Sequence, residues 1–220
     1  MISGSLDASK RLIVGISGAS GALYADRTLV ALASTPHQVE IVASKVGAEI
    51  FRQERQQPLD GFVKGLVEQG ARFRMWDPYD FYAPFSSGSQ PYDGMVVVPC
   101  SGGALGRIAF GTSPDLVSRA ADVCLKENWP LVLVLREAPL SEVHLRNMLR
   151  LRRAGAVIMP ASPGFYSQPK DLIEMADSLV QRILDHLQVE ARVFRRWRES
   201  AATMRARGPQ PASGTGDVQP

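Results

Sequence analysis

Five apolar runs rich in β-branched residues recur along this chain, and segments with helical spacing separate them. A strand that is apolar at consecutive positions, rather than at alternate ones, is typical of a parallel sheet covered by helices on both faces. Parallel strands also need long crossover connections, which the helical segments supply. The runs are "RLIVGI", "QVEIVA", "DGMVVVPC", "PLVLVLR" and "GAVIMPA".

This alternation predicts an α/β fold, a single doubly wound domain of the Rossmann or flavodoxin-like kind with a mostly parallel sheet. At 220 residues the chain is long enough for one sizeable domain and short for two. We expect the domain at residues 10 to 198, between a flexible N-terminal tail (1 to 9) and a disordered C-terminal tail (199 to 220). Helices are expected at residues 22 to 34, 46 to 56, 103 to 110, 114 to 127, 141 to 153 and 170 to 187, and an irregular loop at 76 to 92.

Composition and residue spacing exclude several classes of protein. A net charge of +3 is too small to indicate a nucleic-acid partner. Cys100 and Cys124 form no C-x-x-C motif, and His37, His144 and His186 lie far apart in the sequence, so no metal site is expected. The polar N-terminus and the lack of an apolar run of about 18 residues predict a cytoplasmic protein without a membrane partner.

Serines and glycines recur where the first three runs end, which in a doubly wound fold is the ligand-binding edge. These ends are Gly18–Gly21, Ser44–Lys45 and Ser101–Gly103. Backbone N–H groups at such turns, together with the helices that follow, bind phosphate well. Three such ends in one sheet favour a mononucleotide phosphate, and the glycine spacing of "VGISGASGA" matches neither the dinucleotide motif nor the P-loop. Ordinary helix capping by the serines is the alternative.

The helix expected at residues 114 to 127 carries a single stripe of charged residues on an otherwise apolar surface. A mostly buried helix must give such charges partners, so the stripe is either an internal ladder of ion pairs or the wall of a polar site. Its members, at positions i, i+4, i+7 and i+11, are Asp115, Arg119, Asp122 and Lys126.

Arg136 and Glu137 directly follow the run "PLVLVL", at the mouth of a central strand. A guanidinium in this place suits a phosphate or a flavin carbonyl, and a carboxylate can transfer protons. One structural ion pair at the end of the strand is the alternative.

Taken together and in order, these segments resemble the flavin prenyltransferases (UbiX type), a family once described as 3-polyprenyl-4-hydroxybenzoate decarboxylases. The resemblance covers about residues 10 to 198. It rests on "VGISGASGA", "SSGS", "PCSGGAL", "RAADVCLKENWPLVLVLREAPL", "HLRNML", "GAVIMPASPGFYSQP" and "RRW", of which the fourth and sixth are specific to the family.

The resemblance implies an enzyme that transfers a dimethylallyl group from dimethylallyl phosphate to reduced FMN and so forms a fourth, non-aromatic ring on the flavin. Either the monophosphate or the diphosphate fits as donor. The product, prenylated FMN, would serve as cofactor for a UbiD-type decarboxylase. The resemblance also implies a homo-oligomer, a dodecamer with active sites at subunit junctions, and no metal.

The resemblance assigns roles to residues of this chain, position by position. FMN would be held by Gly18, Ala19, Ser20, Ser44, Ser101, Gly102, Gly103, Ala104 and Arg136. Dimethylallyl phosphate would be held by Phe81, Ser89, Arg119, Lys126, Tyr166 and Arg182, the last two from a neighbouring subunit. Ser20, Lys126 and Glu137 are the implied catalytic residues, and Glu137 would assist proton transfer and the departure of phosphate.

These residue types suit that chemistry on their own. Breaking an allylic C–O bond leaves a cation, which an aromatic wall such as Phe81 can stabilise, and a phosphate, which Arg119 and Lys126 can neutralise. The sequence departs from the family's pattern at Ala104, where a threonine is common. A lost neutral hydrogen bond costs about 1 kcal/mol, so we expect weaker FMN binding with function retained.

Three other functions compete with this reading. A flavoprotein decarboxylase acting on cysteine-like thiols would need an active-site histidine, and no helical histidine follows the "GASG" turn. A non-catalytic FMN carrier subunit of a decarboxylase would bind flavin without needing five residues that occur together here, namely Arg119, Lys126, Glu137, Tyr166 and Arg182. A direct decarboxylase would need a carboxylate site separate from the prenyl phosphate site.

Overall fold

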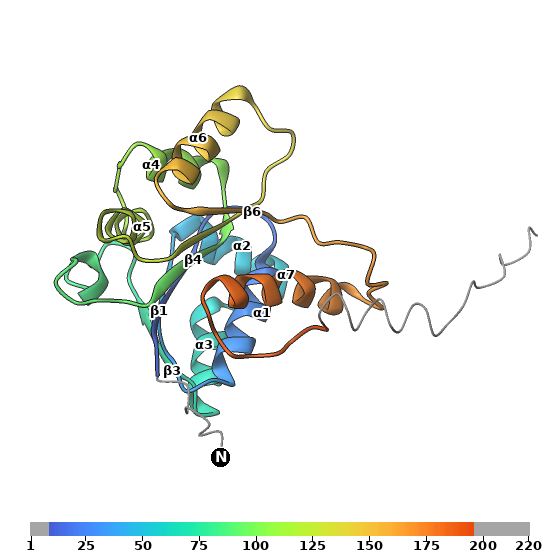
Figure 1. Cartoon of the computed structure of the whole chain (residues 1–220). Helices are drawn as coiled ribbons and strands as arrows, with labels where there is room; N and C mark the ends of the chain where they lie inside the picture. The colour runs from blue at the N-terminus through green and yellow to red at the C-terminus, as the bar shows by residue number, and fades with distance from the viewer. Residues whose placement is uncertain (1–8, 196–220) are drawn as a thin grey trace, which may run out of the picture.

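The computed structural model describes residues 9–195, and these contain one sheet with strands in the order β3-β2-β1-β4-β5-β6 (Figure 1). The strands are β1 (Arg11–Ile16), β2 (Gln38–Ala43), β3 (Arg72–Trp76), β4 (Gly94–Cys100), β5 (Leu131–Leu135) and β6 (Val157–Pro160). Every neighbouring pair is parallel. The predicted doubly wound α/β domain is therefore confirmed. Its strand order reverses between β1 and β4, which is where such folds bind ligands.

Helices cover both faces of the sheet (Figure 1). One face carries α1 (Ala22–Ala33), α2 (Lys45–Arg55), α3 (Leu59–Glu68) and α7 (Leu172–His186). The other carries α4 (Gly102–Ala109), α5 (Leu116–Glu127) and α6 (Glu142–Arg153), with the 3₁₀ turn η1 (Pro84–Ser86) packed beside α5. Each predicted helix lies within two residues of its expected bounds.

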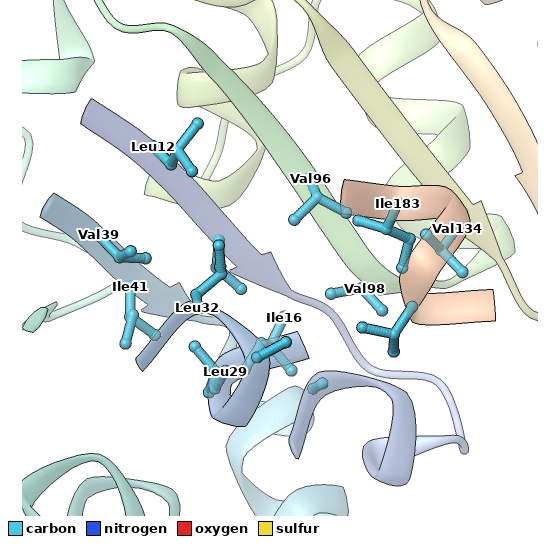
Figure 2. Close-up of a cluster of buried hydrophobic side chains, with 14 of the residues drawn as sticks. Leu12, Ile16, Leu29, Leu32, Val39, Ile41, Val96, Val98, Val134 and Ile183 are labelled. Carbon is cyan, nitrogen blue, oxygen red and sulfur yellow. The ribbon is translucent and has the colours of Figure 1, made fainter. Parts of the chain in front are cut away.

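Two apolar cores lie between the sheet and its helices because strand residues point alternately to opposite faces. Leu12 and Ile16 of β1 face α1 and α7, and they share one core with Leu29 of α1 and Ile183 of α7 (Figure 2). Ile13 belongs to the core on the other face. These side chains are almost fully buried, and each such burial stabilises the fold by roughly 1.5–3 kcal/mol.

Two elements were missed by the sequence prediction, namely α3 and β3. Gly61 and Gly65 lie inside α3, and glycine is a poor helix former, so the helical pattern is weak there. β3 is an edge strand whose sequence "RFRMW" interrupts apolar residues with arginine, unlike the continuous runs of the central strands. The predicted irregular loop consequently starts one residue too early, because Trp76 ends β3.

The predicted tails (1 to 9 and 199 to 220) lie outside the described residues, apart from Ser9, and so does the end of the predicted domain after Arg195. Between residues 9 and 195, none of the helices has the length and apolar character that crossing a membrane requires.

Candidate active site

The turns that follow β1 and β4 are tied together at the point where the strand order reverses. The buried hydroxyl of Ser17 donates to the carbonyl of Pro99 at 2.9 Å and accepts from the amide of Ser101 at 2.8 Å. The amide of Ser17 donates to the same carbonyl at 3.2 Å. These bonds fix the Gly18–Gly21 turn against the turn that begins α4.

A cleft of about 460 Å³ opens beside these two turns. It lies at the carboxyl ends of β1, β2 and β4, where the N-termini of α2, α4 and α5 converge. Helix N-termini present unpaired N–H groups and a partial positive charge, so the cleft suits an anion. Its lining residues are Gly18, Ser44, Lys45, Val46, Tyr79, Ser101, Arg107, Pro114 and Asp115.

Each of the three helices has its N-cap residue in this cleft. The side chain of Ser44 accepts from the amide of Gly47 at 3.0 Å, and that of Ser101 accepts from the amide of Ala104 at 3.1 Å. Asp115 caps α5 in the same way. Capping was the alternative to ligand binding, and it does occur. A capping hydroxyl still has its own hydrogen to donate, so the same serines can also bind a ligand.

Two glycines allow this close arrangement. Gly21, the N-cap residue of α1, has a φ of 112°, in the left-handed region that favours glycine. A Cβ at Gly47 would lie only 2.6 Å from the carbonyl oxygen of Ile16, so glycine lets α2 start against the end of β1.

A second group of polar residues surrounds the start of α1. Arg136 Nε donates to the carbonyl of Ser20 at 3.1 Å. The carboxylate of Glu54, near the end of α2, accepts from the amides of Gly21 and Ala22 at 2.9 and 2.7 Å. Burial raises the pKa of Glu54, but hydrogen bonds from Ser20 and these two amides, with the charge of Arg136, outweigh it and leave the pKa below its ordinary value.

Glu137 follows Arg136 in the chain, two residues after the end of β5. Its Oε1 accepts from the amide of Ala138 at 3.2 Å. A Cβ at Gly102 would lie 2.9 Å from Glu137 Oε2 and 2.8 Å from His144 Nε2, so both side chains border the N-terminus of α4. His144 Nδ1 accepts from the amide of Ser141 at 3.2 Å, which leaves Nε2 to carry the hydrogen of the neutral ring.

Two of the residues predicted to bind the prenyl phosphate, Arg119 and Lys126, lie on α5. Arg119 donates from Nε to the carbonyl of Ser86 at 3.0 Å and pairs with Asp122 at 3.0 Å. Lys126 pairs with Glu127. The stripe on this helix therefore contains ion pairs, as one of the two readings predicted, although Asp115 lies nearest to Arg107 rather than to Arg119.

The loop that carries Ser89 brings that serine close to Lys126. Phe85 anchors the loop in an aromatic core, with ring centroids 5.9 Å from Trp76 and 6.0 Å from Tyr92. A Cβ at Gly88 would lie 2.8 Å from Lys126 Nζ. Ser89 thus lies beside the C-terminal turn of α5.

Lys126 and Ser89 lie at the opposite end of the strands from the cleft, whereas Arg119 is one helical turn from Asp115. The loop after Ser89 meets Arg11, the first residue of β1, through a hydrogen bond of 3.3 Å to the side chain of Gln90. The cleft lies where β1 ends, and α5 starts there with Asp115. A twelve-residue helix is about 18 Å long, so Lys126 lies far from the cleft of its own chain.

The three remaining residues predicted to bind the prenyl phosphate are exposed on the surface. Phe81 is in the loop before η1, Tyr166 is in the loop after β6, and Arg182 is on the outer side of α7. About half of the Tyr166 surface is accessible (53%). The chain therefore gathers the predicted cofactor residues at one edge and leaves the predicted substrate residues in separate places.

The flavoprotein family profile matches residues 2–187. The flavin prenyltransferase UbiX of Methanothermobacter thermautotrophicus is 42% identical over 188 residues, which are 86% of this chain and 95% of that protein. The chain belongs to the flavin prenyltransferase family. The family predicted from the sequence is thereby confirmed.

Two solved structures of related proteins agree with this assignment. The crystal structure of AnUbiX in complex with FMN and dimethylallyl pyrophosphate has a TM-score of 0.80 at 41% identity, covering 86% of this flavin prenyltransferase and 97% of that chain. A dodecameric FMN-dependent UbiX-like decarboxylase from Escherichia coli O157:H7 has a TM-score of 0.77 at 41% identity, covering 85% and 98%.

Sequence reasoning did not assign three polar residues of this flavin prenyltransferase that border the site: Glu54, Arg107 and His144. Glu54 lies 32 residues after Ala22 in the sequence, so its contact with this turn becomes apparent only from the packing of α2 on α1. His144 was judged structural because it is isolated in the sequence, yet α6 places its ring beside Glu137. Arg107 lies six residues after Ser101, on the second turn of α4, and its approach to the cleft depends on how that helix packs.

The two cysteines of the enzyme contribute no reactive thiol here. Burial raises the pKa of Cys100 and of Cys124 to about 12, which keeps both thiols protonated. Within residues 9–195 there is also no group of three or more His, Cys, Asp or Glu side chains that could hold a metal ion.

Proposed function

We propose that this enzyme transfers a dimethylallyl group from dimethylallyl phosphate to reduced FMN, giving prenylated FMN. One observation carries the proposal: a cleft large enough for a mononucleotide, with three helix N-termini, lies beside the Ser20, Arg136 and Glu137 group. The relative crystallised with FMN and dimethylallyl pyrophosphate supports this choice of both substrates.

The residues of the cleft fit a mononucleotide. A volume of about 460 Å³ is in the range of small-molecule sites. The N-termini and Lys45 match a phosphate, and the glycine at position 18 keeps the backbone open, since a Cβ there would lie 2.7 Å from Val46 Cγ1. The residues that would hold FMN are Gly18, Ala19, Ser20, Ser44, Ser101, Gly102, Gly103, Ala104 and Arg136.

When bound, reduced FMN supplies the electron-rich flavin ring that takes up the dimethylallyl group. The chain's own residues would orient the flavin and accept the proton that it releases. Arg136 fixes the backbone carbonyl of Ser20, and the Ser20 side chain hydrogen-bonds to Glu54, so this turn is held in place beside the cleft. Glu137 Oε2, which borders the N-terminus of α4, is the atom placed to accept a proton released as the new bond forms.

Arg119, Lys126 and Ser89 would bind the phosphate of the donor, with Phe81, Tyr166 and Arg182 completing the site. Arg119 and Lys126 would neutralise the phosphate as its C–O bond to the allyl group breaks. Because Lys126 lies about a helix length from the cleft of its own chain, we propose that a second copy of the chain supplies Lys126 to that cleft. A homo-oligomer, and a dodecamer in particular, is supported by the dodecameric relative from Escherichia coli O157:H7.

We further propose that prenylated FMN passes to a UbiD-type decarboxylase, and that the enzyme acts in the cytoplasm. Both proposals rest on the sequence resemblance. Neither is needed for the chemistry at the cleft.

An anaerobic assay tests the reaction. The pure protein would be mixed with reduced FMN and dimethylallyl monophosphate, or diphosphate in a parallel reaction, and the extracted flavin analysed by mass spectrometry. We expect a flavin heavier by one prenyl unit with at least one donor. FMN that is bound but unchanged with both donors would contradict the proposal and favour a carrier of FMN.

A further inference from the structure

The cleft contains a cation that neither the family resemblance nor the pattern at the strand ends assigns. Arg107 lies on the second turn of α4 and lines the cleft together with Ser44, Lys45 and Ser101. Its side chain is 36% exposed, so it is open enough to meet a ligand yet largely surrounded by protein.

The guanidinium of Arg107 has donors to spare. Its Nε is buried and has no hydrogen-bond partner within residues 9–195. Its nearest carboxylate oxygen, Asp115 Oδ2, is 3.9 Å from Nη2, which is beyond hydrogen-bonding distance. The other oxygen of Asp115 is occupied in capping α5, where it accepts from the amide of Ser118 at 2.8 Å.

Arg107 also lies on the same side of α4 as Ala104, one turn further along the helix. Ala104 is the position where this chain lacks the hydroxyl that is common in the family. A guanidinium has five N–H donors in a planar fork that matches two phosphate oxygens. The guanidinium can therefore donate more hydrogen bonds to the phosphate than the missing hydroxyl could.

We propose that Arg107, together with Lys45, binds the phosphate of FMN and compensates for the hydroxyl that Ala104 lacks. This inference rests on the proposed function in that it takes FMN as the ligand of the cleft. The charges of the cleft agree with it. Lys45, Arg107 and three helix N-termini face a single carboxylate, that of Asp115, so a dianionic phosphate is favoured over a neutral group.

The test compares two flavins that differ only in the phosphate. The full-length protein, freed of flavin, would be titrated with FMN and with riboflavin, and the dissociation constants measured by calorimetry. We expect Arg107→Gln to raise the Kd for FMN on the order of 10- to 100-fold, since a lost charge-assisted bond has about that effect. The Kd for riboflavin should stay within about twofold of the wild-type value, because a flavin without phosphate never meets Arg107.

Arg150→Gln is the matched control. The guanidinium of Arg150 lies 4.3 Å from the ring centroid of Phe110, in a different part of the surface. Its loss should leave both dissociation constants unchanged. Thermal melting would confirm that both variants are folded.

A second variant tests whether Arg107 merely supports Asp115. Asp115→Asn keeps a good N-cap and removes the charge. If Arg107 binds phosphate, Arg107→Gln should weaken FMN binding by a similar factor in the Asp115→Asn background. Disappearance of the effect in that background, equal losses for FMN and riboflavin, or no loss at all would each overturn the proposal.

These measurements use no prenyl donor, so they stand apart from the reaction itself. A wild-type protein that binds FMN through Arg107 but forms no prenylated flavin would refute the proposed reaction and uphold this inference. A wild-type protein that binds neither flavin would refute the assignment of FMN to the cleft.

Discussion

Arg136 holds the backbone of Ser20, its Nε donating to the Ser20 carbonyl at 3.1 Å across a sequence separation of more than one hundred residues. Glu54 holds the next two amides of the same turn. The start of α1 is thus fixed from β5 and from α2 at once. The turn that gives the sequence its most visible glycine pattern depends on charged residues that lie elsewhere in the chain.

Glu54→Gln should lower the melting temperature at neutral pH, because the carboxylate accepts hydrogen bonds from Ser20, Gly21 and Ala22 and lies near Arg136. The folded-state pKa of Glu54 lies below its ordinary value of 4.5, so the stabilisation is complete above 4.5 and is lost as the pH falls through the folded pKa. Melting curves from pH 7 to pH 3 should show the wild type and the variant converging at the acid end.

Glu68→Gln is the control for that experiment. Glu68 is exposed on α3 and lies 3.9 Å from Lys64, a surface pair of the kind that contributes little. A gap between wild type and Glu54→Gln that widens towards low pH would reverse the assigned sign.

Glu137→Gln should retain FMN and slow prenyl transfer by roughly 10²- to 10⁴-fold, the usual contribution of a positioned proton acceptor. Single-turnover formation of prenylated flavin, monitored by mass spectrometry, would measure the rate, and the FMN content of the purified protein would serve as the binding check. Glu142→Gln, on the exposed start of α6 where Glu142 pairs with Arg146, should leave the rate unchanged. Turnover near the wild-type level in Glu137→Gln would remove this residue from the mechanism.

Ala104→Thr should tighten FMN binding by about fivefold, the factor that corresponds to one neutral hydrogen bond of about 1 kcal/mol. Riboflavin and FMN titrations of the variant would measure the change, and Ala104→Val is the control of similar shape without the hydroxyl. Equal affinities of the Thr and Val variants for FMN would show that position 104 makes no polar contact with the cofactor.

Mixing two inactive variants should restore activity. If the cleft and Lys126 meet only between chains, an oligomer of Glu137→Gln and Lys126→Ala subunits contains some sites in which both residues are intact. Co-expression of differently tagged subunits, followed by tandem purification and the prenyl transfer assay, would measure the recovery. The two homo-oligomers are the controls. Activity no higher than theirs would indicate that each chain builds its whole site alone.

Deleting residues 203 to 220 should leave prenyl transfer intact, because the polar, Pro- and Gly-rich composition of this segment predicts no part in a packed site. The residues lie outside the described part of the chain, so the prediction rests on sequence. Comparing the turnover of the truncated and full-length enzymes would test it, with melting curves as the check on folding. A folded but inactive truncation would contradict it.

Much of this fold could be predicted because the central strands are buried on both faces. Such strands must be apolar throughout, and the runs that contain Val96 and Val132 are. The sequence did not predict edge strand β3, because its two exposed arginines interrupt the apolar run. Helix α3, which precedes β3, was not predicted because its two glycines weaken the helical pattern.

The candidate site was less predictable, for a different physical reason. Ser44 and Ser101 follow strands directly, so their place at the edge of the sheet could be inferred from sequence alone. Glu54 and His144 reach the site from the far turn of α2 and the first turn of α6. Their positions depend on how helices pack, which no local pattern encodes.

Helix α5 (Leu116–Glu127) is capped at the cleft by Asp115 and carries Lys126, beside Ser89, in its last turn. In the proposed assembly this helix therefore contributes to two active sites, with its first turn in one and its last turn in the other. A substitution that distorts the middle of α5, at a buried residue such as Ala121, would disable two active sites for every altered chain. In an oligomer that mixes altered and normal chains, the fraction of intact active sites would therefore fall more steeply than the fraction of normal chains.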